Sequence, residues 1–122
     1  MLKFEKSCGA VVYTFIDKEI KYLLVQNLEG VYGFPKGHME LNETEEETAL
    51  REIKEEVGLN VELIDGFKEE ETYLTIKKQK ALKTVIYFLA HYKNQEFKYQ
   101  REELFLSFVA LRREFRRGRR GR

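Results

Sequence analysis

The sequence predicts a single α/β domain in which a mixed β-sheet is flanked by helices. One observation is a bounded helix at residues 45–57, which lies between segments rich in β-branched and aromatic residues. Another is the run at residues 84–90, which is almost entirely apolar or β-branched, as in a central strand covered on both faces. The length of 122 residues suits one domain with its own core.

Five strands are predicted, two before the helix and three after it. Residues 9–15 and 21–26 form the first two, which a short polar turn at Asp17 and Lys18 joins. The other three cover residues 61–64, 82–91 and 105–111. We find neither an internal repeat nor an interdomain linker between these segments.

The helix has recognisable ends. Thr44 and Glu47 have the spacing of a capping box, in which each side chain satisfies a free backbone donor at the start of a helix. Gly58 supplies the left-handed residue that commonly ends a helix. These limits give a helix of roughly 13 residues, near the average for globular proteins.

The two faces of this helix differ in character. At about 100° per residue, the apolar side is expected to hold Leu50, Ile53 and Val57, with Glu46 and Ala49 near its edge. The opposite side carries Glu52, Glu55 and Glu56. Their spacing of three and four residues places these carboxylates close together.

Carboxylates crowded on one helical face repel each other by about a few tenths of a kcal/mol per pair. Hard divalent cations remove this repulsion, and Mg²⁺ typically binds a few carboxylates together with substrate phosphates. Arg51 lies one turn before Glu55 and is expected to fix its rotamer. The pattern therefore predicts a metal site, with a plain charged surface helix as the alternative.

The acidic helix belongs to a longer pattern. Gly37 is followed after five residues by Glu43, and after seven more by Arg-Glu-Ile-Lys-Glu-Glu-Val-Gly-Leu, from Arg51 to Leu59. This pattern resembles the Nudix box, the signature of enzymes that hydrolyse a nucleoside diphosphate linked to another group. The resemblance implies the α/β/α sandwich of that family, as a hydrolase domain over residues 1–111.

Segments outside the box narrow the resemblance. They are similar to the asymmetrically cleaving diadenosine tetraphosphate hydrolases at Tyr32-Gly33-Phe34-Pro35-Lys36-Gly37-His38, Gly66-Phe67-Lys68, Tyr73 and residues 83–90. The likeness runs from about Gly9 to Leu111. It implies hydrolysis of dinucleoside polyphosphates, with ATP and AMP as products if diadenosine tetraphosphate is the substrate.

The resemblance also implies a metal site with Mg²⁺, or alternatively Mn²⁺, as the cofactor. Its ligands would be the backbone carbonyl of Gly37, the carboxylates of Glu52, Glu55 and Glu56, and a late-loop glutamate, either Glu102 or Glu103. Arg51 would orient a glutamate of the set, and Glu52 is a candidate for the general base. The catalytic residues implied are Arg51, Glu52, Glu55 and Glu56.

Five residues are candidates for contact with the substrate: Lys36, His38, Tyr73, Lys83 and Tyr87. Lys36 would meet the phosphates as a point charge, and Lys83 belongs to a lysine cluster that either attracts phosphates or keeps a loop soluble. Tyr73 and Tyr87 would stack on a base for roughly 1–3 kcal/mol, although Tyr87 could equally be a packing residue. His38 either donates to a phosphate oxygen or has no role.

Residues 112–122 form an Arg-rich C-terminal tail that differs from the rest of the chain. Seven arginines against one glutamate give the tail a local charge of +6, and because the whole chain carries +1, the remainder carries −5. The remainder has thirteen lysines and two arginines, whereas the tail has no lysine. Three explanations are open: binding to RNA, an anionic membrane or the phosphate-rich ligand; a solvated helix end; or a gene segment read one base out of frame.

Cys8 is the only cysteine, so an internal disulfide is excluded, and its apolar neighbours predict a buried residue. No apolar run is long enough to span a bilayer, and the N-terminus lacks a signal-peptide pattern. We therefore expect a cytoplasmic protein whose partner is a nucleotide or polyphosphate. Alternatives to dinucleoside polyphosphates are nucleoside triphosphates, the 5′ end of RNA, diphosphoinositol polyphosphates, or nucleotide binding without catalysis.

Overall fold

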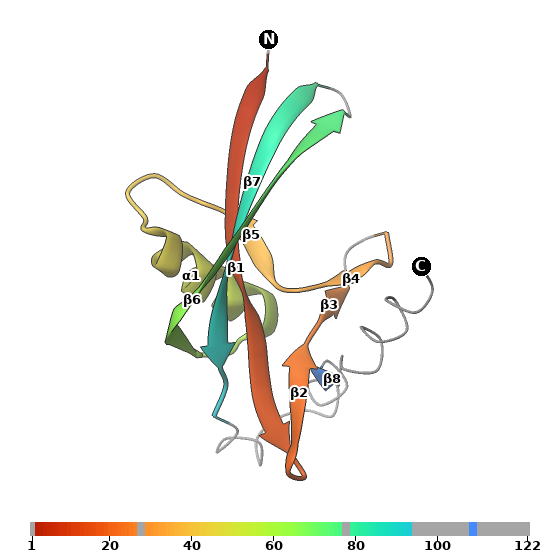
Figure 1. The fold of residues 1–122 in the computed structure, drawn as a ribbon, viewed down its shortest axis with the longest axis vertical. Coiled ribbons are helices and arrows are strands. Elements are labelled where there is room, and N and C mark those ends of the chain that lie inside the picture. The colour runs from red at the N-terminus through yellow and green to blue at the C-terminus, as the bar shows by residue number, and fades with distance from the viewer. Residues whose placement is uncertain (1, 27–28, 77–78, 94–107, 110–122) are drawn as a thin grey trace.

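The structure, a computed structural model, describes residues 2–26, 29–76, 79–93 and 108–109. In chain order its elements are β1 (Lys3–Ile16), β2 (Glu19–Leu23), β3 (Val25–Gln26), β4 (Tyr32–Gly33), β5 (Lys36–His38), α1 (Glu45–Val57), β6 (Glu62–Ile76), β7 (Lys80–His91) and β8 (Phe108–Val109) (Figure 1). This is the mixed α/β fold predicted from the sequence, and α1 is the single helix of the described ranges. The Arg-rich tail, Glu102 and Glu103 lie outside these ranges.

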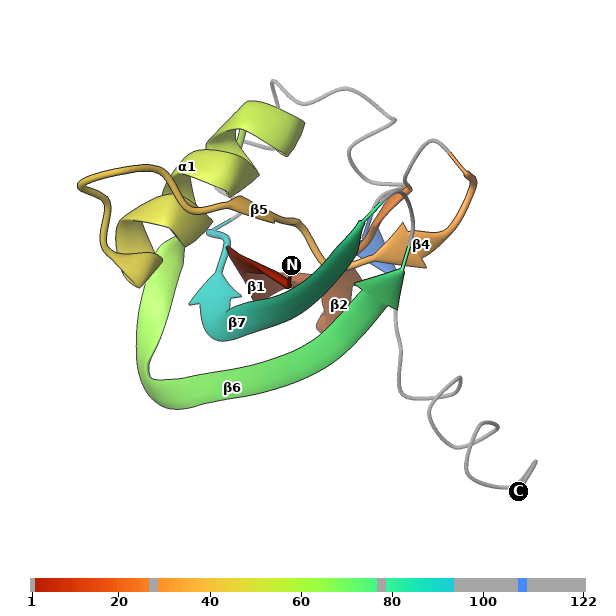
Figure 2. The same cartoon turned by 90° about the horizontal axis from the view of Figure 1, so that it is seen from above.

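Six strands form the main sheet, in the order β6-β7-β1-β2-β8, with β5 also paired to β1. The pairing of β1 with β7 is parallel and the other pairings are antiparallel, so the sheet is mixed. One edge of β1 is paired with β7. The other edge of β1 is shared by two strands: β5 pairs along Ser7–Gly9, and β2 pairs along Tyr13–Ile16. Figure 2 shows α1 and β4 on opposite sides of the view, with β5 between them.

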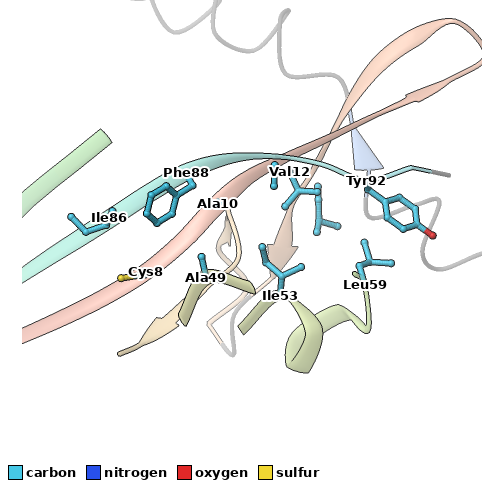
Figure 3. Packing of buried hydrophobic residues seen from close by; sticks show 11 residues of the cluster. Cys8, Ala10, Val12, Ala49, Ile53, Leu59, Ile86, Phe88 and Tyr92 are labelled. Atoms are coloured by element: carbon cyan, nitrogen blue, oxygen red, sulfur yellow. The ribbon is translucent and has the colours of Figure 1, made fainter. Parts of the chain in front are cut away.

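The core lies between α1 and the face of the sheet on which alternate residues of β1 and β7 are buried (Figure 3). Ala49 and Ile53 of α1 are fully buried there. Burial of a side chain such as Ile53 typically contributes about 1.5–3 kcal/mol. The strand residues of the same cluster are Cys8, Ala10, Val12, Leu23, Ile86, Phe88 and Ala90. Burial raises the pKa of the Cys8 thiol to about 11, so this residue is the buried apolar one predicted.

The predicted ends of the helix are confirmed. The Thr44 hydroxyl accepts a hydrogen bond from the Glu47 backbone N–H at 3.0 Å, and the Glu47 carboxylate accepts one from the Thr44 backbone N–H at 2.8 Å. Gly58 follows α1 with a φ of 74°, and its N–H donates to the carbonyl of Lys54 at 2.9 Å. Capping residues at both ends thus set the limits of α1.

The apolar face of α1 is rotated from the one predicted. Leu50 was expected to face the core but is 37% exposed, whereas Ala49, expected at the edge, is fully buried. The helix contacts the sheet along the line of Ala49 and Ile53, with Val57 partly buried against the same cluster. Since Leu50 lies about 100° round the helix from Ala49, this contact line leaves it near the solvent.

Several strands have boundaries other than those predicted. β1 begins at Lys3 because it pairs with β7 from that residue onward. The predicted strand 21–26 is divided, since β2 ends at Leu23 and Val25–Gln26 pairs with β4. The predicted strand 61–64 continues to Ile76 as β6, through a register shift between Ile64 and Lys68. Neither β4 nor β5 has a counterpart in the prediction.

The remaining predictions agree with the structure where it describes them. β7 covers the predicted strand 82–91, and it lies inside the sheet between β6 and β1. The turn at Asp17 and Lys18 has φ values of 51° and 67°, as in a tight hairpin turn. Of the predicted strand 105–111, the described residues are Phe108–Val109, which pair with β2. No helix in the described ranges is both long and apolar enough to cross a membrane.

Candidate active site

The register of the sheet gathers all five predicted substrate residues on one face. Paired residues of neighbouring strands point to the same side, and alternate residues of a strand share a side. One row across the strands contains Tyr73, Lys83 and Glu5. The next row contains Glu71, Val85, Ser7 and His38, and the third contains Glu69, Tyr87, Gly9 and Lys36. We call these three rows the substrate face; the alternate residues, such as Cys8 and Ile86, point to the core beneath α1.

Lys36 and Tyr87 are two of the partly buried residues of the substrate face. Burial lowers the pKa of the Lys36 ammonium, and the nearby charge of Lys83 lowers it further. Burial raises the pKa of the Tyr87 phenol to about 12, with smaller contributions from Glu71 and Tyr73. Tyr87 therefore stays protonated at neutral pH and can donate a hydrogen bond.

An aromatic contact holds Tyr87 in place. The ring of Phe34 meets the ring of Tyr87 edge to face, with centroids 6.0 Å apart and planes at 75°. Such pairs contribute roughly 0.5–1.5 kcal/mol beyond their buried area. Phe34 lies two residues before Lys36, so the segment that leads into β5 packs against β7. The sequence reading gave no role to Phe34.

Arg51 joins the start of the box to its acidic helix. Its Nε and Nη2 donate to the two carboxylate oxygens of Glu43, at 2.6 and 3.1 Å. Nη1 donates to Glu52 at 2.9 Å and to Glu55 at 3.1 Å, so the predicted pairing of Arg51 with Glu55 is confirmed. Nη2 also donates to the backbone carbonyl of His38 at 2.9 Å. One guanidinium thus ties β5 and the following loop to the glutamates of α1.

Glu43 is a site residue to which the sequence reading assigned no role. Its pKa falls to about 2, chiefly because Arg51 donates to it, and further because the backbone N–H of Glu40 and the hydroxyl of Thr48 do so. The carboxylate therefore remains charged and keeps Arg51 in position. Its fixed place within the box marked Glu43 as part of the pattern, but the spacing alone did not show that it meets Arg51.

Gly37 provides the surface on which Glu52 lies. A Cβ added at Gly37 would come 2.0 Å from Cδ of Glu52 and within 2.3 Å of both of its carboxylate oxygens. Gly37 pairs with Cys8, so its Cα faces the α1 side of the sheet. A side chain at position 37 would therefore displace the carboxylate of Glu52.

Glu56 lies near the same strand. Its pKa is raised, first because the carboxylate is partly desolvated and next because the charge of Glu52 is close. The backbone N–H of Lys36 donates to it and opposes this rise. The charge of Glu55 adds to the repulsion. The acidic side of α1 therefore holds negative charge that the described residues do not fully compensate.

The donor set fits a hard divalent cation. The carboxylates of α1 and the nearby Gly37 backbone provide only oxygen ligands, the type that Mg²⁺ and Mn²⁺ prefer. A cation at this place would relieve the repulsion from Glu52 and Glu55 that contributes, after desolvation, to the raised pKa of Glu56. Within the described residues, however, no three His, Cys, Asp or Glu side chains converge closely enough to hold an ion, and Arg51 contacts both Glu52 and Glu55. The predicted ligand Glu102 lies outside the described ranges.

A family comparison matches most of the chain. The model of the NUDIX domain matches residues 6–117. The chain belongs to the Nudix family. This Nudix hydrolase is also similar to named enzymes, and together these findings identify it as a hydrolase that acts on phosphoric anhydrides.

Among its relatives is the asymmetrical bis(5′-nucleosyl)-tetraphosphatase of Mus musculus, which is 34% identical over 119 residues, or 87% of this chain and 79% of the mouse protein. The enzyme of the same name from Sus scrofa is 36% identical over 102 residues, which cover 75% of this chain and 67% of the Sus scrofa protein. The crystal structure of the C. elegans Ap4A hydrolase superimposes with a TM-score of 0.66 at 30% identity, covering 76% of this chain and 71% of that one.

Proposed function

We propose that this Nudix hydrolase is a Mg²⁺-dependent pyrophosphohydrolase that cleaves dinucleoside polyphosphates, with diadenosine tetraphosphate giving ATP and AMP. One observation carries the proposal: Lys36 belongs to both parts of the site. Its side chain lies on the substrate face with Tyr73, Lys83 and Tyr87, while its backbone N–H donates to Glu56 of the acidic helix. A polyphosphate held by Lys36 therefore lies next to the acidic side of α1. The names of the relatives support this substrate class.

The substrate face supplies binding groups for both parts of a dinucleotide. Lys36 and Lys83 neutralise phosphate oxygens as point charges. Tyr73 and Tyr87 contact a nucleobase, since every base presents a flat face on which an aromatic ring can stack. His38 is exposed at the edge of the same face and donates to a phosphate oxygen.

The acidic helix supplies the hydrolytic groups. Glu52, Glu55 and Glu56, the carbonyl of Gly37 and Glu102 would hold Mg²⁺ or Mn²⁺. When bound, the cation neutralises phosphate charge and lowers the pKa of water. Arg51, fixed by Glu43, orients Glu52 and Glu55.

The reaction itself needs one proton acceptor and one stabilised leaving group. Glu52 accepts the proton of the attacking water as that oxygen forms a bond to phosphorus. The anhydride P–O bond breaks, and the oxygen that leaves with the departing nucleotide keeps the electron pair. Lys36 or Lys83 neutralises that oxygen. We include a cytoplasmic location in the proposal, because the single buried cysteine suits a reducing compartment.

A second candidate substrate is the 5′ end of RNA. The Arg-rich tail favours it, since clustered arginines bind phosphate backbones without sequence preference. The tail lies outside the described residues, so this candidate rests on the sequence alone.

The test is product analysis with Mg²⁺ on diadenosine tetraphosphate, ADP-ribose, dGTP, triphosphorylated RNA and a diphosphoinositol polyphosphate. We expect ATP and AMP as the main products and the highest kcat/KM for the first substrate. Preference for RNA would support the second candidate, and no turnover of any substrate would refute catalysis.

The matched variant pair is Glu56→Gln and Glu46→Gln. Both carboxylates are exposed on α1, but Glu56 is next to β5, whereas Glu46 lies in the first turn. We expect Glu56→Gln to lose at least about 100-fold in kcat, because it removes a carboxylate that we propose holds the cation, and Glu46→Gln to keep normal turnover. Equal activities in the two variants would contradict the assignment of Glu56 to the site.

A further inference from the structure

Glu71 of β6 occupies the middle of the substrate face, although nothing in its local sequence marks it as functional. It lies in the middle row, in register with Val85 of β7 and Ser7 of β1. Along β6, its neighbours on the same side are Tyr73 and Glu69, each about 6.6 Å away at 3.3 Å per residue. Glu71 is exposed.

The charge of Glu71 is felt by residues of two other strands. It contributes to the raised pKa of the Tyr87 phenol on β7, and it opposes the lowering of the pKa of Lys36 on β5. Glu69, although it is on the same face, contributes to neither shift. No ion pair among the described residues includes Glu71. Its carboxylate is therefore available to a ligand.

A carboxylate at the position of Glu71 favours contact with the base of a nucleotide over contact with its phosphates. It repels phosphate oxygens, so the polyphosphate is kept towards Lys36 and Lys83. An ionised carboxylate has only acceptor oxygens, so it binds N–H and O–H groups. In a nucleotide these donors are on the base and on the ribose. Tyr73 and Tyr87, whose rings can stack on a base, are both close to Glu71, so the base is the part of the nucleotide placed beside its carboxylate.

We propose that Glu71 determines base specificity, by accepting hydrogen bonds from ring and amino N–H groups of a purine held against Tyr73 and Tyr87. This inference rests on the proposed function. Guanine offers two adjacent donors, its N1–H and its 2-amino group, and so satisfies both oxygens of the carboxylate. Adenine offers its 6-amino group alone. Uracil has a carbonyl on each side of its N3–H, and those carbonyls are repelled.

The test compares kcat/KM for diguanosine, diadenosine and diuridine tetraphosphates in the wild type and in Glu71→Gln. We expect the wild type to rank guanine first and uracil last. Glu71→Gln keeps the shape and removes the charge, and should reduce the guanine-to-uracil ratio by about 10- to 100-fold, because a hydrogen bond to a charged group contributes more than a neutral one.

Two neighbouring glutamates provide controls. Glu70→Gln also removes one negative charge, but on the opposite side of β6. Glu69→Gln removes one negative charge on the substrate face, one row away from Glu71. Both should retain the wild-type ratio. A ratio that falls equally in Glu69→Gln would mean that general charge sets the preference, and an unchanged ratio in Glu71→Gln would overturn the proposal.

A binding measurement separates this inference from the proposed function. If the wild type hydrolyses none of the three dinucleotides, the proposed function fails. The affinities of GTP, ATP and UTP, measured by calorimetry with the same variants, then test Glu71 alone. Loss of the preference for GTP over UTP in Glu71→Gln supports the role of Glu71, and equal affinities in the wild type refute it.

Discussion

At the scale of single residues, the contact between Gly37 and Glu52 constrains the site most tightly. The carboxylate of Glu52 lies where the side chain of any other residue at position 37 would begin. Arg51 holds the same carboxylate at 2.9 Å from the other side. These two contacts restrict the position of Glu52, as accurate placement of the general base that we propose requires.

We expect Gly37→Ala to reduce kcat/KM by about 100-fold, the effect of misplacing a catalytic group by roughly 1 Å. The added Cβ would displace the Glu52 carboxylate, and because that side chain is near the surface, the free energy of unfolding should change little. The measurement is steady-state hydrolysis together with urea denaturation. Gly33→Ala is the control, since no atom lies within 4 Å of a Cβ added there. Similar losses in both variants would contradict the mechanism.

The sequence predicted some of the contacts between site residues and missed others. The spacing of the box was sufficient to place Arg51 beside Glu55, because both lie on one helix. It was not sufficient to assign a role to Glu43 or Glu71. Glu43 meets Arg51 through a loop, and Glu71 joins the substrate face only through the pairing of β6 with β7. Contacts set by helical spacing can be derived locally, whereas contacts set by sheet register cannot.

At the scale of elements, one ionic cluster ties the start of α1 to the sheet. Glu45, in the first turn of the helix, accepts from Lys6 of β1 at 2.5 Å and from Lys68 of β6 at 2.8 Å. Hydrogen bonds from Lys6 and then Lys68 lower the pKa of Glu45, and the pKa values of both lysines are raised. The lysines are about half exposed, so solvent screens these pairs and their contribution to stability is small.

The pH dependence of this contribution has a definite sign. Because the pKa of Glu45 is lower in the folded state, its stabilisation is present above the ordinary value of 4.5 and is lost as the pH falls below it. We expect Glu45→Gln to lower the melting temperature at pH 7 by a few degrees, and the difference from the wild type to shrink as the pH falls below 4.5. Glu46→Gln, also in the first turn, serves as the control in thermal denaturation. A difference that persists at low pH would exclude the ionic explanation.

The limits of a helix or strand were predicted correctly where residues close in the sequence determine them. The limits of α1 follow from Thr44, Glu47 and Gly58, and these were correct. β6 was predicted far too short, because consecutive glutamates at 69–71 hide the alternation of an exposed strand that is stabilised by pairing with β7. β5 is three residues long and exists through its pairing with β1. Neither strand is marked by its own composition.

At the scale of the whole molecule, the proposed function depends on two faces that meet at β5. One is the substrate face, formed by β1, β5, β6 and β7, and the other is the acidic side of α1. The parallel pairing of β1 with β7 brings residues about 80 positions apart into register, such as Gly9 with Tyr87. The family resemblance predicted this fold, whereas periodicity alone identified the separate elements.

The last prediction concerns the stability of the whole domain in the presence of a divalent cation. A ligand that binds the folded state alone stabilises it by about 2.7 kcal/mol at 100 times its Kd, which corresponds to roughly 10 °C in the melting temperature of a domain of this size. We expect such a rise with MgCl₂ or MnCl₂ and not with NaCl of equal ionic strength. The reason is that the charges of Glu52 and Glu55 repel that of Glu56 in the free protein.

Two variants test whether the cation that raises the melting temperature binds at the acidic side of α1. Glu56→Gln removes one of the carboxylates near β5 and should abolish most of the rise, while Glu46→Gln should preserve it, because that carboxylate lies in the first turn of α1. The readout is thermal denaturation, so it is independent of any substrate. If Glu56→Gln gains as much stability from MgCl₂ as the wild type does, the cation binds elsewhere, and the acidic side of α1 is a charged surface rather than a metal site.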